Sequence, residues 1–133
     1  SKECREYAPY HALRGDITLR LARQAAAEQR KGTELLFQEA VAGLARAVEL
    51  DPEPVAPRLL LAQAQFESNK AEDAVGSATR LLLHMQSQGG GKPEDLLALH
   101  TLRARAAGAL YAQKKGGGTD DKELLDAARA SYR

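Results

Sequence analysis

The stretch that decides the fold runs from Ala40 to Ala74 and reads AVAGLARAVELDPEPVAPRLLLAQAQFESNKAEDA. Apolar residues recur at helical spacing on both sides of the segment Asp51-Pro52-Glu53-Pro54. A proline disfavours the helical conformation in the residue before it, so this segment separates two helices. The stretch therefore predicts the second half of one helical hairpin, a turn marked by prolines, and most of a second hairpin.

The composition of the whole chain supports an all-α fold. The 133 residues are rich in Ala, Leu, Arg, Glu, Gln and Lys, which are good helix formers, while residues that favour strands are sparse. A chain of this length is expected to form one domain, here residues 1–133. It begins and ends within helix-compatible segments, so we expect it to be a fragment of a larger protein.

Outward from the central stretch, the pattern predicts six helices in three hairpins, at about 8–52, 53–88 and 93–133. Glycine-rich segments at 89–92 and 116–118 are predicted to be flexible loops. The first helix is expected to end near Arg30, and the fifth near Gln113. Thr33 is expected to cap the second helix. Gly15 lies within the first helix, where we expect it to let another helix approach closely.

The central stretch resembles the tetratricopeptide repeat (TPR), a unit of roughly 34 residues built from two helices. Ala40, Leu44, Ala47 and Pro52 match the residue types and the spacing of the second helix of a unit. Ala62 and Ala74 are separated as the small residues of the next unit are. The third hairpin is similar but has a longer loop, and in the first hairpin either Gly15 or Ala22 can take the first small position; we favour Gly15.

The resemblance implies three antiparallel hairpins stacked as a TPR-like solenoid, and an up-and-down helical bundle is the alternative for the same Ala and Leu pattern. In the family, the first helices of successive hairpins line a groove that binds a peptide or a helix of a partner. Carried onto this chain, the groove residues are Asp16, Arg20, Leu59, Gln63, Phe66, Glu67, Leu102, Arg105 and Gln113. For Leu59 and Phe66, packing in the core is an equally good interpretation.

One specialised ligand of the family is disfavoured. Members that clamp the C-terminal carboxylate of chaperones use an Asn where Leu60 stands in this chain. The resemblance therefore implies a protein-interaction scaffold for another kind of partner. The alternative is a structural segment or an oligomerisation module of a larger helical-repeat protein, without a ligand of its own, and self-association is compatible with either.

No residue set indicates an enzyme, a metal site or a cofactor. The three histidines are far apart in the sequence, and Cys4 is the only cysteine, which suits an intracellular, cytoplasmic location. The formal net charge of +1 gives no general attraction to nucleic acid or to membranes. No apolar run approaches the roughly 20 residues that a membrane span needs. We therefore expect a protein partner and neither nucleic acid nor a membrane.

Overall fold

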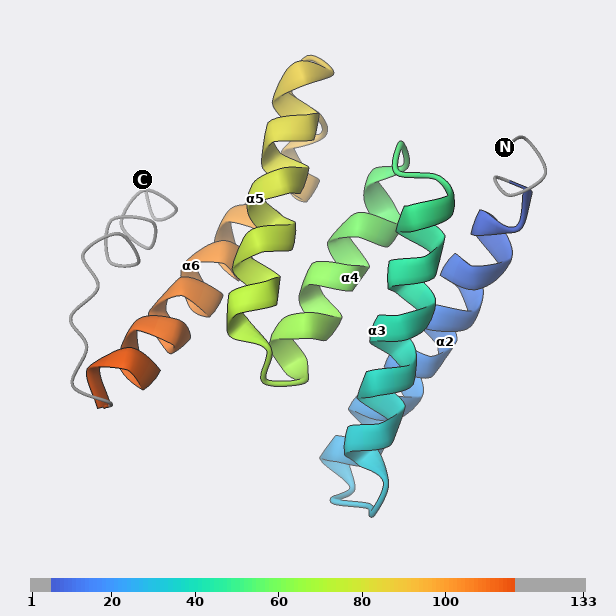
Figure 1. The fold of residues 1–133 in the computed structure, drawn as a ribbon, viewed down its shortest axis with the longest axis vertical. Helices are drawn as coiled ribbons and strands as arrows, with labels where there is room; N and C mark the ends of the chain where they lie inside the picture. Colours follow the sequence, from blue (N-terminus) through green and yellow to red (C-terminus); the bar gives the residue numbers. More distant parts are fainter. Residues whose placement is uncertain (1–5, 117–133) are drawn as a thin grey trace.

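A computed structural model describes residues 6–116, and this part of the chain is all-α, as predicted. Consecutive helices run alternately down and up in the view of Figure 1. The predicted sixth helix and residues 117–118 of the second glycine loop lie outside the described residues, as does Cys4. The helices are α2 (Ala8–Ala27), α3 (Thr33–Leu50), α4 (Val55–Glu67), α5 (Ala71–Ser87) and α6 (Pro93–Gly116).

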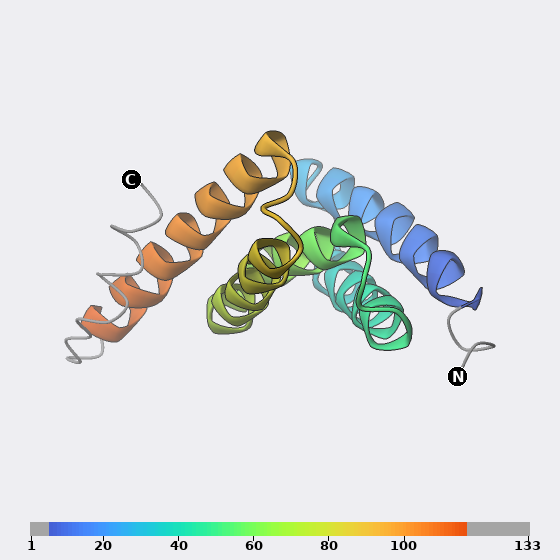
Figure 2. The ribbon, with the colours of Figure 1, turned by 90° about the horizontal axis from the view of Figure 1, so that it is seen from above.

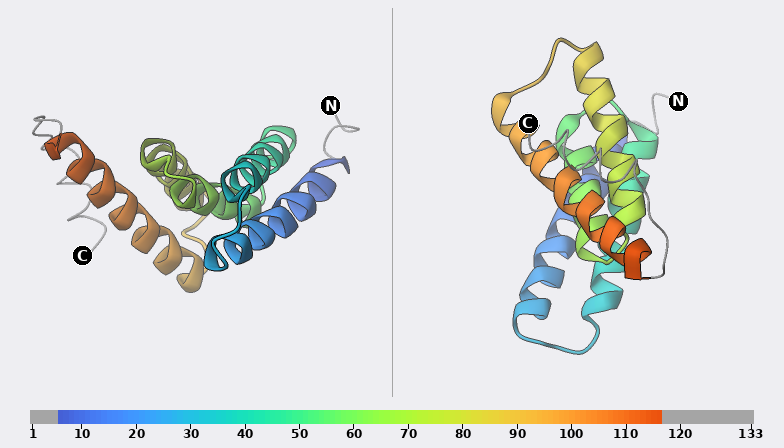
Figure 3. Two further views of the ribbon diagram at one scale, coloured as in Figure 1. Left: turned by 90° about the horizontal axis from the view of Figure 1, so that it is seen from below. Right: turned by 90° about the vertical axis from the view of Figure 1, so that its left-hand side faces the viewer.

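The helix α4 lies at the centre of this arrangement. It packs against each of the other four helices, while α2 and α3, and likewise α5 and α6, pack as neighbours in the sequence. Seen from above, α2 and α6 form the two arms of a V, and α3 and α5 lie between the arms (Figure 2). The view from below in Figure 3 shows the same separation, with α2 and α6 on one side of α4 and α3 and α5 on the other.

Two hydrophobic cores meet at α4. The first core lies between α2, α3 and α4, and the second lies between α4, α5 and α6. Leu61 and Ala64 of α4 belong to the first core, and Ala62 belongs to the second. The first core consists of Leu19, Ala22, Phe37, Ala40, Leu44, Leu61 and Ala64. The second consists of Ala62, Ala78, Leu81, Leu82, Met85, Leu99 and Leu102.

Three of the helices end in the same way. Shortly after α2, α4 and α5, the backbone takes a positive φ, at Gln29 (55°), at Asn69 (65°) and, after α5, at Gly89 (99°) and the two glycines that follow it. The backbone N–H directly after Gln29, Asn69 or Gly89 then donates to a carbonyl five residues earlier, at 2.9, 2.8 and 2.8 Å respectively. This pattern satisfies carbonyls that the end of a helix leaves unpaired. By contrast, α3 ends at the extended Asp51 that precedes Pro52, as the proline rule predicts.

The ends of two helices and the cap of a third differ from the prediction. The first helix ends at Ala27 instead of near Arg30, because Gln29 already has a left-handed backbone. Gly32, not Thr33, is the residue before α3; its φ of 84° suits glycine, and the Thr33 hydroxyl donates to the Arg30 carbonyl at 2.7 Å. In addition, α6 continues to Gly116, beyond the predicted end near Gln113.

Gly15 lies where α2 crosses α3. A Cβ atom at this position would lie 2.7 Å from Cγ of Leu44 and 3.1 Å from the backbone nitrogen of Leu44. Gly43 faces it from α3, since a Cβ atom there would lie 3.5 Å from the Gly15 Cα. The two helices are therefore closer than any side chain at position 15 allows, in agreement with the close approach that we predicted for Gly15.

This close approach predicts that Gly15→Ala destabilises the protein by about 1–3 kcal/mol, because Leu44 has to shift within a packed core. Gly108→Ala is the matched control, since Gly108 lies within α6 and a Cβ there meets no atom of residues 6–116 within 4 Å. That control should gain about 0.5–1 kcal/mol from helix propensity. Urea denaturation of both variants measures the difference. Equal stability changes at the two positions would contradict the assigned crossing of α2 and α3.

Candidate partner-binding site

A cleft of about 320 Å³ opens between α2, α4 and α6. Its position follows from the arrangement of these helices, which lie next to one another on the side of the fold opposite α3 and α5 (Figure 2). Charged and apolar side chains both contribute to the walls. The lining residues are Arg23 from α2, Gln63, Phe66 and Glu67 from α4, and Ala98, Thr101, Leu102 and Arg105 from α6.

An ion pair joins the first and second of these helices across the cleft. Nε of Arg23 donates to one carboxylate oxygen of Glu67 and an Nη atom donates to the other, each at 2.8 Å. The bond to Glu67 raises the pKa of Arg23; burial opposes this effect, and the charges of Glu67 and Asp16 add to it. A two-pronged bond of this kind fixes the geometry of both groups, so the ion pair holds α2 against the end of α4.

The opposite wall carries an arginine above an aromatic ring. The guanidinium carbon of Arg105 lies 5.0 Å from the centre of the Phe66 ring, a distance at which the ring attracts a cation. Phe66 is half-buried and packs on the second core, which holds the ring in place. Among residues 6–116, no carboxylate pairs with Arg105. Arg105 therefore presents a positive charge at the cleft, and within the described residues no carboxylate forms an ion pair with it.

Five of the predicted groove residues come together here. Gln63, Phe66 and Glu67 project from successive turns of α4, and Leu102 and Arg105 do so from α6. Leu102 is also buried in the second core, so it lies at the floor of the cleft and exposes little of its side chain.

The other four predicted residues lie elsewhere. Asp16 and Arg20 pair with each other at 3.2 Å along α2 and are not among the residues that line the cleft. Leu59 packs against the second core, in agreement with its core interpretation. Gln113 is exposed near the end of α6, two turns beyond Arg105.

Three residues of the cleft, Arg23, Ala98 and Thr101, are not among the residues predicted from the sequence. Signals for each were present in the helical spacing. Arg23 lies seven residues after Asp16, which places the two side chains on one side of α2, and its charge is opposite to that of Glu67. Ala98 and Thr101 each lie one turn before a predicted residue, Leu102 and Arg105. On α6, the predicted residues begin one turn after the first residue that lines the cleft. On α2, they end one turn before Arg23.

The cleft carries a small excess of positive charge. The three charged groups of the cleft, Arg23, Glu67 and Arg105, give it one net positive charge. In the described ranges, no three His, Cys, Asp or Glu side chains gather where they could hold a metal ion. No helix between residues 6 and 116 has the length and apolar character to cross a membrane.

Comparison with protein-family models, with curated proteins and with solved structures finds no match to this chain.

The ion pair across the cleft yields a prediction for stability. A double-mutant cycle on Arg23→Ala and Glu67→Ala should give a coupling energy of about 0.5–1 kcal/mol, the value of a well-oriented pair that is partly exposed. The coupling should fall in 1 M salt, because screening weakens the attraction. Thermal or urea denaturation of the four proteins measures it. A coupling energy of zero at low salt would remove the assigned link between α2 and α4.

Proposed function

We propose that the chain is a TPR-like protein-interaction scaffold whose cleft between α2, α4 and α6 binds an acidic peptide or an acidic helix of a partner protein. The observation that carries this proposal is Arg105, a cation held above Phe66 with no carboxylate partner in the described part of the chain. A partner that supplies a carboxylate beside an apolar side chain satisfies both groups at once.

The order of helix contacts favours stacked hairpins over the up-and-down bundle. The helix α4 packs on α2 and on α6, although neither adjoins it in the sequence. This pattern is expected when the first helices of successive hairpins lie side by side. The same three helices line the cleft, as the groove of a TPR-like solenoid requires.

The size of the cleft sets what it can hold. Its volume lies at the low end of the roughly 300–1,000 Å³ found for ligand pockets. One or two side chains of a peptide fit, with the rest of the peptide lying along α4 and α6. We propose a binding role without catalysis or a cofactor, in a reducing compartment such as the cytoplasm, where the single Cys4 needs no partner cysteine. The chaperone carboxylate clamp remains disfavoured, since Leu60 packs against the first core.

Selection from a random peptide library displayed on phage tests the proposal. We expect the selected peptides to be acidic with at least one apolar residue, and to bind the 133-residue chain with micromolar affinity. Arg105→Glu should weaken binding by about tenfold or more, because it places a like charge beside the peptide.

Arg46→Glu is the matched control for that experiment. It makes the same change of charge on α3, where Arg46 is exposed and pairs with Glu49 at 3.3 Å, outside the cleft. Its affinity for the selected peptides should change less than twofold, apart from a general effect of net charge that salt removes. Equal losses in the two variants, or peptides without acidic residues, would contradict the proposal.

A second function, self-association, is favoured by a separate observation on α2. Five large apolar side chains lie along one exposed face of this helix and of the residue before it, and each is between 50% and 63% exposed. Contiguous exposed apolar surface marks interaction sites on ordinary proteins. The five side chains are Tyr7, Tyr10, Leu13, Ile17 and Leu21.

If this face mediates self-association, sedimentation velocity should show a concentration-dependent dimer for the wild-type chain. Leu13→Glu combined with Ile17→Glu should leave a monomer, since two charges would be buried without partners. Leu83→Glu, an exposed leucine on α5 outside this face, should leave the dimer intact. A wild-type monomer at high micromolar concentration would exclude this second function and leave the scaffold role untouched.

A further inference from the structure

On the other side of α4, a small pocket of about 60 Å³ lies between α3, α4 and α5. Arg58 and Leu61 of α4 line it, and they project opposite to the cleft residues Gln63, Phe66 and Glu67 because of the helical period. The remaining lining residues are Val48 from α3 and Ser77 and Arg80 from α5. Two arginines from different helices thus converge on one cavity that is separate from the cleft.

The two arginines are held towards the pocket from opposite sides. An Nη atom of Arg58 donates to the Pro52 carbonyl at 3.2 Å, which ties this side chain to the turn before α4. An Nη atom of Arg80 donates to the hydroxyl of the buried Ser77 at 3.4 Å, and that hydroxyl in turn donates to the amide oxygen of Gln65 at 2.6 Å. Ser77 therefore acts as a positioning residue for Arg80.

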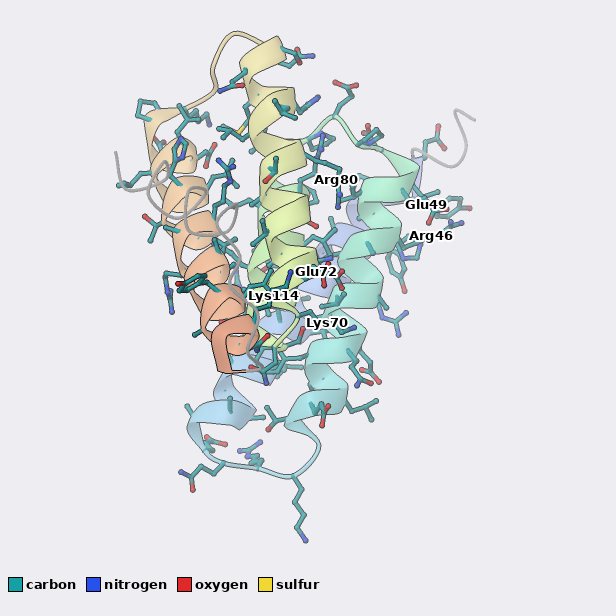
Figure 4. The ribbon with its side chains drawn as sticks, turned by 60° about the vertical axis from the view of Figure 1, so that its left-hand side comes forward. Arg46, Glu49, Lys70, Glu72, Arg80 and Lys114 are labelled. Atoms are coloured by element: carbon teal, nitrogen blue, oxygen red, sulfur yellow. The ribbon has the colours of Figure 1, made fainter. Side chains whose placement is uncertain are left out.

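Gly76 makes room for this placement of Arg80. A Cβ atom at Gly76 would lie 3.2 Å from an Nη atom of Arg80, so the guanidinium lies back along α5 over the glycine. A glycine in the interior of a helix costs about 1 kcal/mol relative to Ala, and here it gives the guanidinium its space. Figure 4 shows Arg80 in the space between α5 and α3, whereas Arg46 and Glu49 project from the far edge of α3.

Within the described part of the chain, neither arginine has a carboxylate partner. Among residues 6–116, no ion pair involves Arg58 or Arg80, and each guanidinium uses one of its five N–H donors in the bonds described above. Burial lowers the pKa of Arg58, the charge of Arg80 lowers it further, and Glu53 opposes the change. Two like charges that share a half-buried pocket repel each other unless an anion lies between them.

We propose that this pocket binds a phosphoryl group through Arg58 and Arg80. A phosphoryl group carries a charge near −2 at neutral pH and three strong acceptor oxygens, which match two guanidinium forks better than the single charge of a carboxylate does. Arginine is the residue suited to this two-pronged recognition. The pocket has room for about two water molecules, so it takes the group alone and leaves the rest of a larger ligand outside.

The group can come from free phosphate or from a phosphorylated side chain, and one titration series separates these sources. The 133-residue chain is titrated with inorganic phosphate, with N-acetyl-O-phosphoserine amide and with acetate, at constant ionic strength in chloride. The readout is the Nε–Hε resonances of Arg58 and Arg80 in the ¹H–¹⁵N spectrum. Saturable shifts in the low millimolar range are expected for both phosphoryl compounds. Tighter binding of phosphoserine amide indicates a phosphorylated side chain, and equal or weaker binding indicates the free ion.

Arg80→Gln tests the assignment to this pocket. Arg80 is exposed, so the variant should keep its melting temperature, while its affinity for phosphate should fall about tenfold. Arg58→Gln should show a similar loss. Arg46→Gln removes the same charge from α3 and should bind phosphate as the wild type does. The absence of saturation, equal losses in Arg46→Gln and Arg80→Gln, or acetate binding as tight as phosphate would overturn the proposal.

Discussion

The whole arrangement depends on the burial of one short helix on two sides. With 13 residues, α4 is too short to be stable in water alone, so its stability comes from packing. Leu61 and Ala64 pack in the first core, and Ala62 packs in the second. Because one helix supplies residues to both cores, neither half of the fold can be completed without it, and the two halves are coupled through it.

The two candidate sites follow from this central position. Phe66 illustrates how packing and binding combine: its ring packs on the second core and also lies below the Arg105 guanidinium. The core interpretation and the groove interpretation of this residue are therefore compatible. On the opposite side of α4, Arg58 reaches into the pocket between α3 and α5. One helix thus forms part of two polar sites while its small and apolar residues complete both cores.

Local signals in the sequence were enough to predict much of this fold. Pro52 indicated the end of α3, and Gly15 indicated a close helix crossing, because both are consequences of backbone geometry that a single residue imposes. The cap of α3 was wrong by one residue, since Gly32 holds the position expected for Thr33, and α6 ends at Gly116 instead of near Gln113. At the start of α3, the choice between capping by a side chain and a left-handed backbone depends on how the neighbouring turn packs, which the sequence pattern does not contain.

The resemblance to the TPR implied the part of the candidate site on α4 and α6, including Gln63 and Arg105. It did not predict the contribution of α2, because the ion pair between Arg23 and Glu67 joins residues 44 positions apart. The same limit applies to Arg58 and Arg80, which carry no motif. Their convergence depends on the angle between α4 and α5 and on the space above Gly76. Long-range charge pairs and convergences of this kind require the three-dimensional arrangement.

Native-state hydrogen exchange, measured residue by residue, tests the central role of α4 most directly. If both cores depend on this helix, the amides of Leu61, Ala62 and Ala64 should exchange only through global unfolding. Amides in the middle of α3 and α5 should then open with the same free energy. Faster exchange in α4 than in the α2–α3 pair, with that pair still protected, would show that the first hairpin is stable without α4 and would contradict this account.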